Sequence, residues 1–443
     1  MKKIIIALLI GIAGFLLASL AFTAKEAALV GLIAFLVTLW TNEGLPLGVV
    51  SLLPIVLFPS FDILSTNDTS LNYSKSIIFL FLGGFFLAIA VEKTGLHKVI
   101  ANKMLSIFPS TVRGIIFSLS ITSGMLSAFL SNTTTTLLLM PLALFLTEDI
   151  KIKMRFALAI AYSASVGGIL TPIGTPPNLI LMGFMEDKGL PAIPFMQWVW
   201  MVLPLVLVMF FVVSFILSLG ASEVKIQADK TTNTMTSEQK KVLFSFLALV
   251  LLLFANAPVK PYYNGLGLNE KGMLLSFGLL MFLPPVNVLT WKDSKKVPYE
   301  IIFLFGAGFS IAAAFTSTGL ANSVASYLLE IKTLPPVLIM LSIAAMVTFT
   351  TEITSNTALI SIMLPVLYAF TEASGLDTTL FLMMATICAS YAFMLPIATP
   401  PNAIAMSSGI VQVGTMAKYG FLFNIIGIVL IVIIASLFWS NFI

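Results

Sequence analysis

Long apolar segments alternate with short polar segments along nearly the whole chain. Segments of about 20 residues, long enough to cross the hydrocarbon core of a bilayer, recur from Ile4 to the C-terminus. Because every backbone N–H and C=O must be paired inside a membrane, these segments predict helices. The expected crossings lie at residues 4–22, 27–41, 45–59, 76–92, 154–184, 195–219, 242–256, 272–290, 299–319, 377–408 and 416–440. The pattern therefore predicts an all-α polytopic membrane protein with about eleven transmembrane helices.

Composition and charge support this class and give the chain an orientation. Of 443 residues, 59% are hydrophobic and 9% are charged, which excludes an ordinary soluble protein. Most lysines and both arginines fall in alternate loops, which predicts that these loops and the N-terminus are cytoplasmic and the C-terminus is outside. We expect the first apolar segment to be retained rather than cleaved, because residues 18–24 lead directly into the next one. The basic loops lie at 92–113, 147–155, 220–241, 291–298 and 409–418.

Two further apolar segments, residues 114–147 and 335–371, do not fit a single crossing. The first lies between Arg113 and the basic stretch 151–155, so both of its ends face the cytoplasm. The flanks of the second are poor in positive charge, which places both of its ends outside. A segment whose ends share one side must enter and return, so we predict two re-entrant helical hairpins.

The sequence also repeats itself, at a constant shift of 224 residues. An odd number of predicted crossings separates the copies, so the two copies have opposite orientations, as in the inverted repeats of secondary transporters. The matching blocks are SNTTTTLLLMP at 131–141 with SNTALISIMLP at 355–365, TPIGTPPN at 171–178 with LPIATPPN at 395–402, and FLFLGGF at 79–85 with FLFGAGF at 303–309.

These features divide the chain into four parts. We expect an N-terminal transmembrane helix at 1–26, a first repeat at 27–220 with hairpin 114–147 and broken helix 154–184, a cytoplasmic linker at 221–241, and a second repeat at 242–443 with hairpin 335–371 and broken helix 377–408.

The polar tip of each hairpin has the chemistry of an anion site. Asn132 and Asn356 are strong candidates to begin the second helix of their hairpins, where free N–H groups and the helix dipole favour negative charge. The hydroxyls of Thr133 and Thr357 add hydrogen-bond donors. The sequence therefore predicts that an anion binds between the two tips.

The GTPPN and ATPPN segments have complementary chemistry, because successive prolines break a helix and free carbonyl oxygens near Gly174 and Ala398. Unwound carbonyls together with the oxygens of Ser127 and Thr351, one turn before the tips, are suited to Na⁺. A doubly charged anion inside a membrane is costly, and bound Na⁺ would offset its charge.

Other polar groups have simpler explanations. Glu352 follows Thr351, but its counterpart in the repeat is Ala128, so both a capping or structural role and a coupling role stay open. We expect the single histidine, His97, to be a solvated loop residue and the single cysteine, Cys388, to serve packing.

At these motifs the sequence resembles the divalent anion:sodium symporter family, of the INDY type. The resemblance covers roughly residues 27–440 and implies a homodimer in which a transport domain, holding both hairpins and both broken helices, moves against a scaffold domain by an elevator mechanism. Residues implied to bind Na⁺ are Ser127, Ser131, Asn132 and Gly174 at one site and Thr351, Ser355, Asn356 and Ala398 at the other. Residues implied to contact the substrate carboxylates are Asn132, Thr133, Thr175, Pro176, Asn356, Thr357, Thr399 and Pro400.

We expect a Na⁺-coupled importer of C4 dicarboxylates, such as succinate, malate and fumarate, in the cytoplasmic membrane of a bacterium, with no nucleic-acid partner. The alternatives are a Na⁺-independent dicarboxylate exchanger, a symporter of citrate or sulfate, an anion channel, and a subunit of a binding-protein-dependent carrier. An intramembrane enzyme is disfavoured because the chain has no HExxH, GxGD or nucleophile-elbow pattern.

Overall fold

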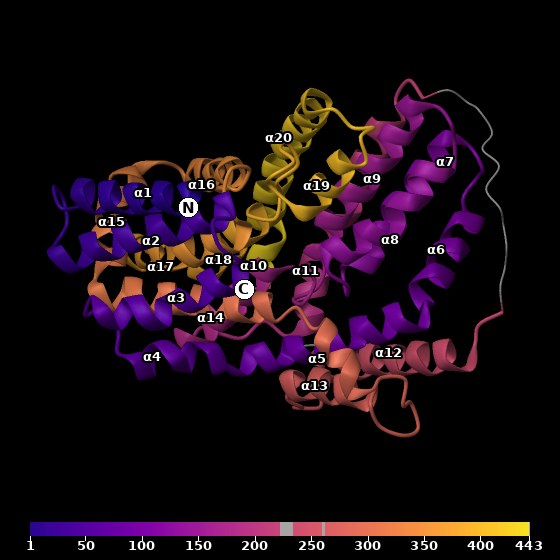
Figure 1. Ribbon diagram of the computed structural model, residues 1–443, viewed down its shortest axis with the longest axis horizontal. Coiled ribbons are helices and arrows are strands. Elements are labelled where there is room, and N and C mark those ends of the chain that lie inside the picture. Colours follow the sequence, from indigo (N-terminus) through magenta and orange to yellow (C-terminus); the bar gives the residue numbers. More distant parts are fainter. Residues whose placement is uncertain (222–233, 259–261, 443) are drawn as a thin grey trace.

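The computed structural model describes residues 1–221, 234–258 and 262–442, and in these ranges the regular structure is entirely helical. Residues 222–233, most of the predicted linker, lie outside the described residues. Figure 1 shows the helices in chain order. The helices before the linker are α1 (Lys2–Ala18), α2 (Ala24–Asn42), α3 (Leu47–Ser60), α4 (Thr66–Leu71), α5 (Ser76–Thr94), α6 (Leu96–Ile107), α7 (Val112–Ser127), α8 (Asn132–Phe145), α9 (Ile150–Gly168), α10 (Pro176–Asp187) and α11 (Phe195–Ser218).

The other described helices come after the linker. They are α12 (Ser237–Asn256), α13 (Glu270–Leu280), α14 (Tyr299–Thr318), α15 (Leu320–Leu328), α16 (Pro336–Thr350), α17 (Asn356–Ser374), α18 (Thr378–Cys388), α19 (Pro400–Ser407) and α20 (Val413–Leu437), with short 3₁₀ turns at 72–74, 291–296, 329–333 and 439–441.

Within the described residues, six helical segments are long and apolar enough to cross a membrane, which makes the chain a multi-pass membrane protein. Several other apolar helices are shorter, among them α3, α7, α8, α16 and α18. The six long segments are Ala24–Asn42, Thr66–Thr94, Phe195–Ser218, Tyr299–Thr318, Asn356–Ser374 and Val413–Asn441.

The segments that the sequence singled out as hairpins and broken helices are each divided into two helices. Residues 114–147 contain all but the first two residues of α7, a break at 128–131, and α8. Residues 335–371 contain α16, a break at 351–355, and most of α17. The predicted broken helices are interrupted at 169–175, between α9 and α10, and at 389–399, between α18 and α19.

Two expectations were wrong. Residues 272–290 are not one helix, because α13 ends at Leu280 and Pro284 and Pro285 follow. His97 is not solvated but 3% exposed, because the chain turns at Gly95 and brings the imidazole Nδ1 to 3.2 Å from the carbonyl oxygen of Val91. Burial lowers the pKa of His97.

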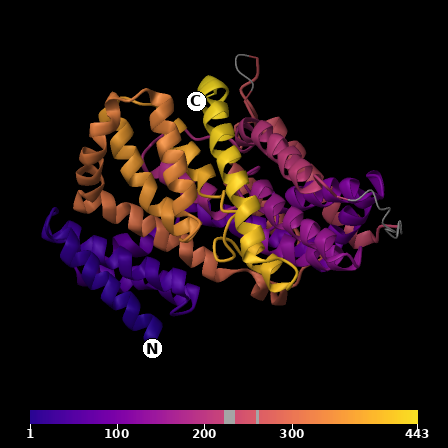
Figure 2. The same ribbon diagram turned by 90° about the horizontal axis from the view of Figure 1, so that it is seen from above.

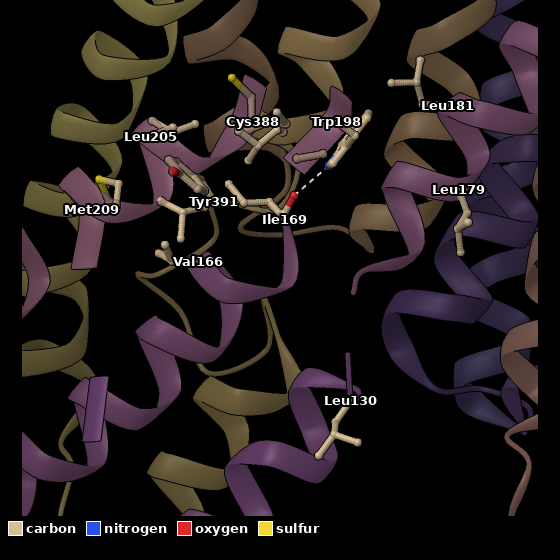
Figure 3. Packing of buried hydrophobic residues seen from close by; sticks show 14 of the residues in the cluster. Leu130, Val166, Ile169, Leu179, Leu181, Trp198, Leu205, Met209, Cys388 and Tyr391 are labelled. Atoms are coloured by element: carbon tan, nitrogen blue, oxygen red, sulfur yellow. Dashed lines mark hydrogen bonds between the residues drawn. The ribbon is translucent and has the colours of Figure 1, made fainter. Parts of the chain in front are cut away.

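The helices pack around two apolar clusters. The smaller cluster joins α1–α3 to α14, α15 and α17, on the left of Figure 1. The larger cluster contains the hairpins, the broken helices and α11, and in Figure 2 the last helix, α20, lies across the middle of the molecule. Figure 3 shows part of this cluster: Trp198 of α11 donates its indole N–H to the carbonyl oxygen of Ile169, at the first break, at 3.0 Å. Cys388 is fully buried there, which fits the expected packing role.

Two glycines allow the first hairpin to lie directly on the first broken helix. Gly124 of α7 faces Gly167 of α9, and a methyl group added at Gly167 would overlap the backbone of Gly124. The two helices therefore approach at backbone distance, as small residues permit in membrane proteins.

Replacing Gly167 with alanine should force α7 and α9 apart, because the obstructing atoms belong to the backbone and cannot rotate away. Overpacking of this kind costs about 1–3 kcal/mol, so the thermal unfolding temperature of the purified protein should fall. Gly414→Ala in α20 is the control, since no atom lies within 4 Å of the added methyl group. Equal unfolding temperatures for the two variants would contradict the close contact.

Candidate functional site

The two hairpins and the two broken helices are brought together by packing that crosses between the halves. The helix α19, from the second broken helix, packs against α8 of the first hairpin and against α9. In the same way α10, from the first broken helix, packs against α17 of the second hairpin and against α18. In the described part of the chain no hydrogen bond joins the two tips directly, so the two halves of the predicted site are connected by this helix packing.

At the first tip, side chains of the SNT motif are held by short local bonds. The helix α8 begins at Asn132, as expected, and the Ser127 hydroxyl donates to Asn132 Oδ1 at 2.6 Å. Ser131 accepts from the backbone N–H of Thr134 at 3.1 Å, which caps the helix. A methyl group on Gly168 would lie 2.6 Å from Asn132 Oδ1, so only glycine leaves room for this amide.

The second tip repeats this geometry with different residues. The helix α17 begins at Asn356, and the Thr351 hydroxyl donates to Asn356 Oδ1, again at 2.6 Å. The same hydroxyl is 2.9 Å from the carbonyl oxygen of Ala389, at the start of the second break. In both halves the amide oxygen is engaged by a hydroxyl, which leaves the amide NH₂ as the group that can donate to a ligand.

The two breaks end in the same way. Thr175 and Thr399 have extended backbones, with φ of −144° and −142°, and each precedes a proline at the first position of the next helix. The N–H of Gly174 donates to the Thr171 carbonyl at 3.3 Å. The N–H of Ala398 donates to the Leu395 carbonyl at 3.2 Å. The predicted substrate and Na⁺ residues of the breaks thus lie in one tight turn in each half.

Two asparagines that the sequence reasoning did not single out close these turns. Asn178 donates from Nδ2 to the carbonyl of Thr171, and Asn402 donates from Nδ2 to the carbonyl of Leu395, both at 3.0 Å. Both side chains are fully buried, and both Oδ1 atoms are without a hydrogen-bond partner. The sequence did contain a signal for these asparagines, because each is the last residue of a TPPN motif and the motif occurs in both halves.

Residues of the first tip line two cavities. Ser131, Thr133 and Thr134 line a cavity of about 270 Å³ whose wall also includes Glu92 and Lys296. Ser131, Gly174 and Pro176 share a smaller cavity with Phe81 and Phe305. The structure therefore brings part of the predicted site together.

The remaining predicted residues differ in exposure. Thr175, Thr357, Ala398 and Thr399 are buried, Ser355 is half-buried, and Pro400 is exposed. Among the described residues no group of three His, Cys, Asp or Glu could hold a metal ion. The predicted cation residues of the tips and breaks offer hydroxyl, amide and carbonyl oxygens, a donor set that suits Na⁺.

Comparisons with known proteins agree with this architecture. The profile of the citrate transporter family matches residues 33–384. The sodium-dependent dicarboxylate transporter SdcS of Staphylococcus saprophyticus is 31% identical over 433 residues, covering 90% of this chain and 83% of the relative. SdcS of Staphylococcus aureus is 31% identical over 470 residues, covering 97% and 90%. The chain belongs to the divalent anion:sodium symporter family, a family of transporters and not of enzymes, and the resemblance noted in the sequence is confirmed.

Two solved transporters share the fold. The YdaH transporter of Alcanivorax borkumensis aligns with a TM-score of 0.61 at 16% identity, over 84% of this chain and 87% of its own. MtrF of Neisseria gonorrhoeae, assigned to a class of antimetabolite efflux pumps, aligns with a TM-score of 0.60 at 14% identity, over 84% and 83%. At these identities the likeness concerns the fold alone.

Replacing Asn132 or Asn356 with alanine should abolish ligand binding without unfolding the protein, because each change removes an amide at a tip rather than a core side chain. Hydrogen bonds to a charged ligand are worth about 1.5–3 kcal/mol, so affinity should fall at least about tenfold. Succinate-dependent thermal stabilisation and uptake measure this, with the exposed Asn322→Ala of α15 as control. Wild-type uptake by a well-folded Asn132→Ala protein would contradict the assignment of the tip.

Proposed function

We propose that this protein is a Na⁺-coupled symporter of C4 dicarboxylates such as succinate, malate and fumarate. The observation that carries the proposal is the pair of equivalent tips, in which a hydroxyl orients an asparagine at 2.6 Å and the amide stands at the start of a helix. The names of the SdcS relatives, sodium-dependent dicarboxylate transporters, support both the substrate class and the coupling ion.

In this proposal each carboxylate of the substrate binds at one tip. The helix N-termini of α8 and α17 supply backbone N–H groups, and Asn132 and Asn356 supply amide donors. Thr133 and Thr357 complete the tips, and Thr175, Pro176, Thr399 and Pro400 are the proposed contacts from the breaks. Two carboxylates on a short chain match two such positively polarised helix ends.

The same residues offer two Na⁺ sites of neutral oxygens. The first would use Ser127, Ser131, Asn132 and Gly174, and the second Thr351, Ser355, Asn356 and Ala398. Because the described residues of these motifs contain no cationic side chain, only Na⁺ would offset the charge of a dicarboxylate there. Anion and cation binding would then depend on one another, which is the basis of symport.

We further propose that transport follows an elevator mechanism in a homodimer, with two re-entrant hairpins and about eleven crossings in an inverted repeat. The N-terminus would be cytoplasmic and the C-terminus outside. The cavity at the first tip is also lined by Glu92 and Lys296, in the loops with predicted cytoplasmic location, which supports assigning this structure to the inward-facing state.

Labelled succinate uptake into proteoliposomes tests the function. Accumulation should require an inward Na⁺ gradient and should stop when K⁺ replaces Na⁺, because the proposed cation sites are needed to hold the anion. Citrate and sulfate should be compared as competitors, since the family profile that matches is that of citrate transporters. Uptake that ignores Na⁺ and needs internal succinate would instead identify an exchanger.

Ion pairs on the opposite side from the cavity connect the proposed moving and static parts. Glu186 and Asp187 lie at the end of α10, in the proposed transport domain. Lys271 of α13 is 2.6 Å from Glu186 Oε1, and Lys75, before α5, pairs with Asp187. If α10 moves along α5 and α13, these pairs must break, so they should stabilise the inward-facing state.

Replacing the acids with amides, Glu186→Gln and Asp187→Asn together, should therefore shift the protein toward the outward-facing state. Partly exposed pairs contribute about 0.2–1 kcal/mol each, so the loss of two pairs should give a shift of roughly two- to thirtyfold. The readout is the labelling rate, from the cytoplasmic side, of a cysteine introduced into the cavity wall by Ala88→Cys. The native Cys388 is fully buried and should not react.

The pair between Lys93 and Asp293, 2.8 Å apart at the cavity side, provides the control. Both residues belong to the proposed scaffold, and the hydrogen bond from Lys93 lowers the pKa of Asp293 to about 2. Asp293→Asn should leave the labelling rate unchanged. An equal effect of both substitutions would mean that the outer pairs do not report on domain movement.

A further inference from the structure

We propose that Glu352 is a positioning residue that holds the second unwound segment, residues 389–399, in the shape that its proposed Na⁺ site requires. The consequence of this role for transport rests on the proposed function, whereas the structural role of Glu352 does not.

The second break is longer than the first. The helix α9 continues to Gly168, whereas α18 already ends at Cys388, which the shift of 224 residues aligns with Ala164 inside α9. In the first half the N–H of Leu170, two residues after the end of α9, still donates to the carbonyl of Gly167 at 3.0 Å, whereas its counterpart Met394 makes no such backbone bond among the described residues. Because this segment is largely buried, such an N–H group needs another partner.

Glu352 supplies such partners. Its side chain is 3% exposed, its Oε1 accepts from the backbone N–H of Met394 at 2.9 Å, and its Oε2 accepts from the backbone N–H of Leu395 at 3.0 Å. The amide of Asn424, from α20, donates to Oε1 at 2.7 Å. Both oxygens are thus engaged by protein donors, which indicates a backbone cap rather than a carboxylate held ready for a proton or cation.

The first half also links its hairpin to its break, but there the side chain belongs to the break residue and donates the hydrogen bond. There the side-chain hydroxyl of Thr171 donates to the backbone carbonyl of Ala128. Positions 128 and 171 correspond to Glu352 and Leu395 in the second half, where the side chain of the hairpin residue accepts from the backbone of the break residue. In both halves a hydrogen bond thus joins these two equivalent positions, and in the second half Glu352 also accepts from the N–H of Met394.

The neighbouring bonds show that these positions are structurally equivalent. The amides of Asn178 and Asn402 reach the carbonyls of Thr171 and Leu395 at the same distance of 3.0 Å. Asn402 also donates to the carbonyl of Ala392 at 3.0 Å, at a position whose counterpart, Gly168, is still within α9. The earlier end of α18 thus accompanies the change from Ala128 to Glu352. Glu352, which replaces the alanine of the first half, therefore lies where the backbone structure of the two halves also differs.

The bond between the Thr351 hydroxyl and the Ala389 carbonyl, at 2.9 Å, depends on the path of this segment. If Glu352 is lost, the segment should relax away from the tip and the second proposed Na⁺ site should weaken. A role in coupling, by contrast, would require the carboxylate to change partners during transport.

The repeat itself provides the test. Glu352→Ala should raise the Na⁺ concentration for half-maximal succinate uptake at least about tenfold, because three hydrogen bonds to a buried carboxylate are lost. Adding Leu395→Thr recreates the pair found at 171 and 128, and the double variant should recover to within about threefold of wild type. Glu372→Ala, which removes an exposed carboxylate from α17, should have no effect. A double variant no better than Glu352→Ala would overturn the proposal.

Hydrogen–deuterium exchange gives a readout that does not depend on transport. Peptides covering 389–399 should be protected in the wild type and exchange faster in Glu352→Ala, while α9 and α10 keep their protection. Should Glu352→Ala fail to fold, Glu352→Gln retains one acceptor and should show an intermediate increase. Unchanged exchange of this segment in a folded variant would refute the positioning role, whereas Na⁺-independent uptake by the wild type would refute only the proposed function.

Discussion

Every helix break in the membrane-spanning part of this protein leaves backbone N–H and C=O groups that lipid cannot satisfy. The structure depends on how these groups are paired at four places, the two hairpin tips and the two broken helices. Asn178 and Asn402 each donate a hydrogen bond to a carbonyl oxygen of their break. Thr175 and Thr399 are each followed by a proline, which begins the next helix and has no N–H group to be paired. The groups that remain unpaired are those available to a ligand.

This constraint explains why the site is polar without being charged. A fixed cation at the tips would attract a dicarboxylate, but it would also need its own counter-charge once the substrate leaves. Helix ends, hydroxyls and amides polarise the site while their net charge stays zero. Glu352, beside the second tip, is bound on both oxygens by N–H donors of the protein, so it orders the backbone of the break.

Much of this arrangement was predictable from sequence, because the signals are local. Asparagine after serine predicts a helix start, and α8 and α17 do begin at Asn132 and Asn356. Two prolines after a threonine predict a break, and the structure has one at each TPPN motif. The assignment of these residues to substrate and Na⁺ remains a prediction.

The features that sequence reasoning missed depend on tertiary packing. His97 is buried because the chain turns at Gly95 and brings the imidazole to the carbonyl of Val91, which no local pattern specifies. Residues 272–290 are a different case, because the missed signal was local: Pro284 and Pro285 follow the end of α13 at Leu280. The partners of Glu352 depend on where α18 ends. Neither this carboxylate nor the unwound segment predicts, from the sequence alone, that the two are in contact.

The two halves hold their breaks with different chemistry, by Thr171 in the first half and by Glu352 in the second, and this difference affects how each proposed Na⁺ site is supported. If both breaks were held by identical bonds, the two proposed Na⁺ sites would respond alike to the substrate. Here the first break is short and is joined to its hairpin by Thr171, whereas the second is longer and is held by a buried carboxylate that also binds α20. The second site is thus connected to more of the structure, and its geometry depends on the position of α20 as well as on the hairpin. The approximate repeat therefore gives the two halves equivalent candidate residues, while the departure from it distinguishes the two halves.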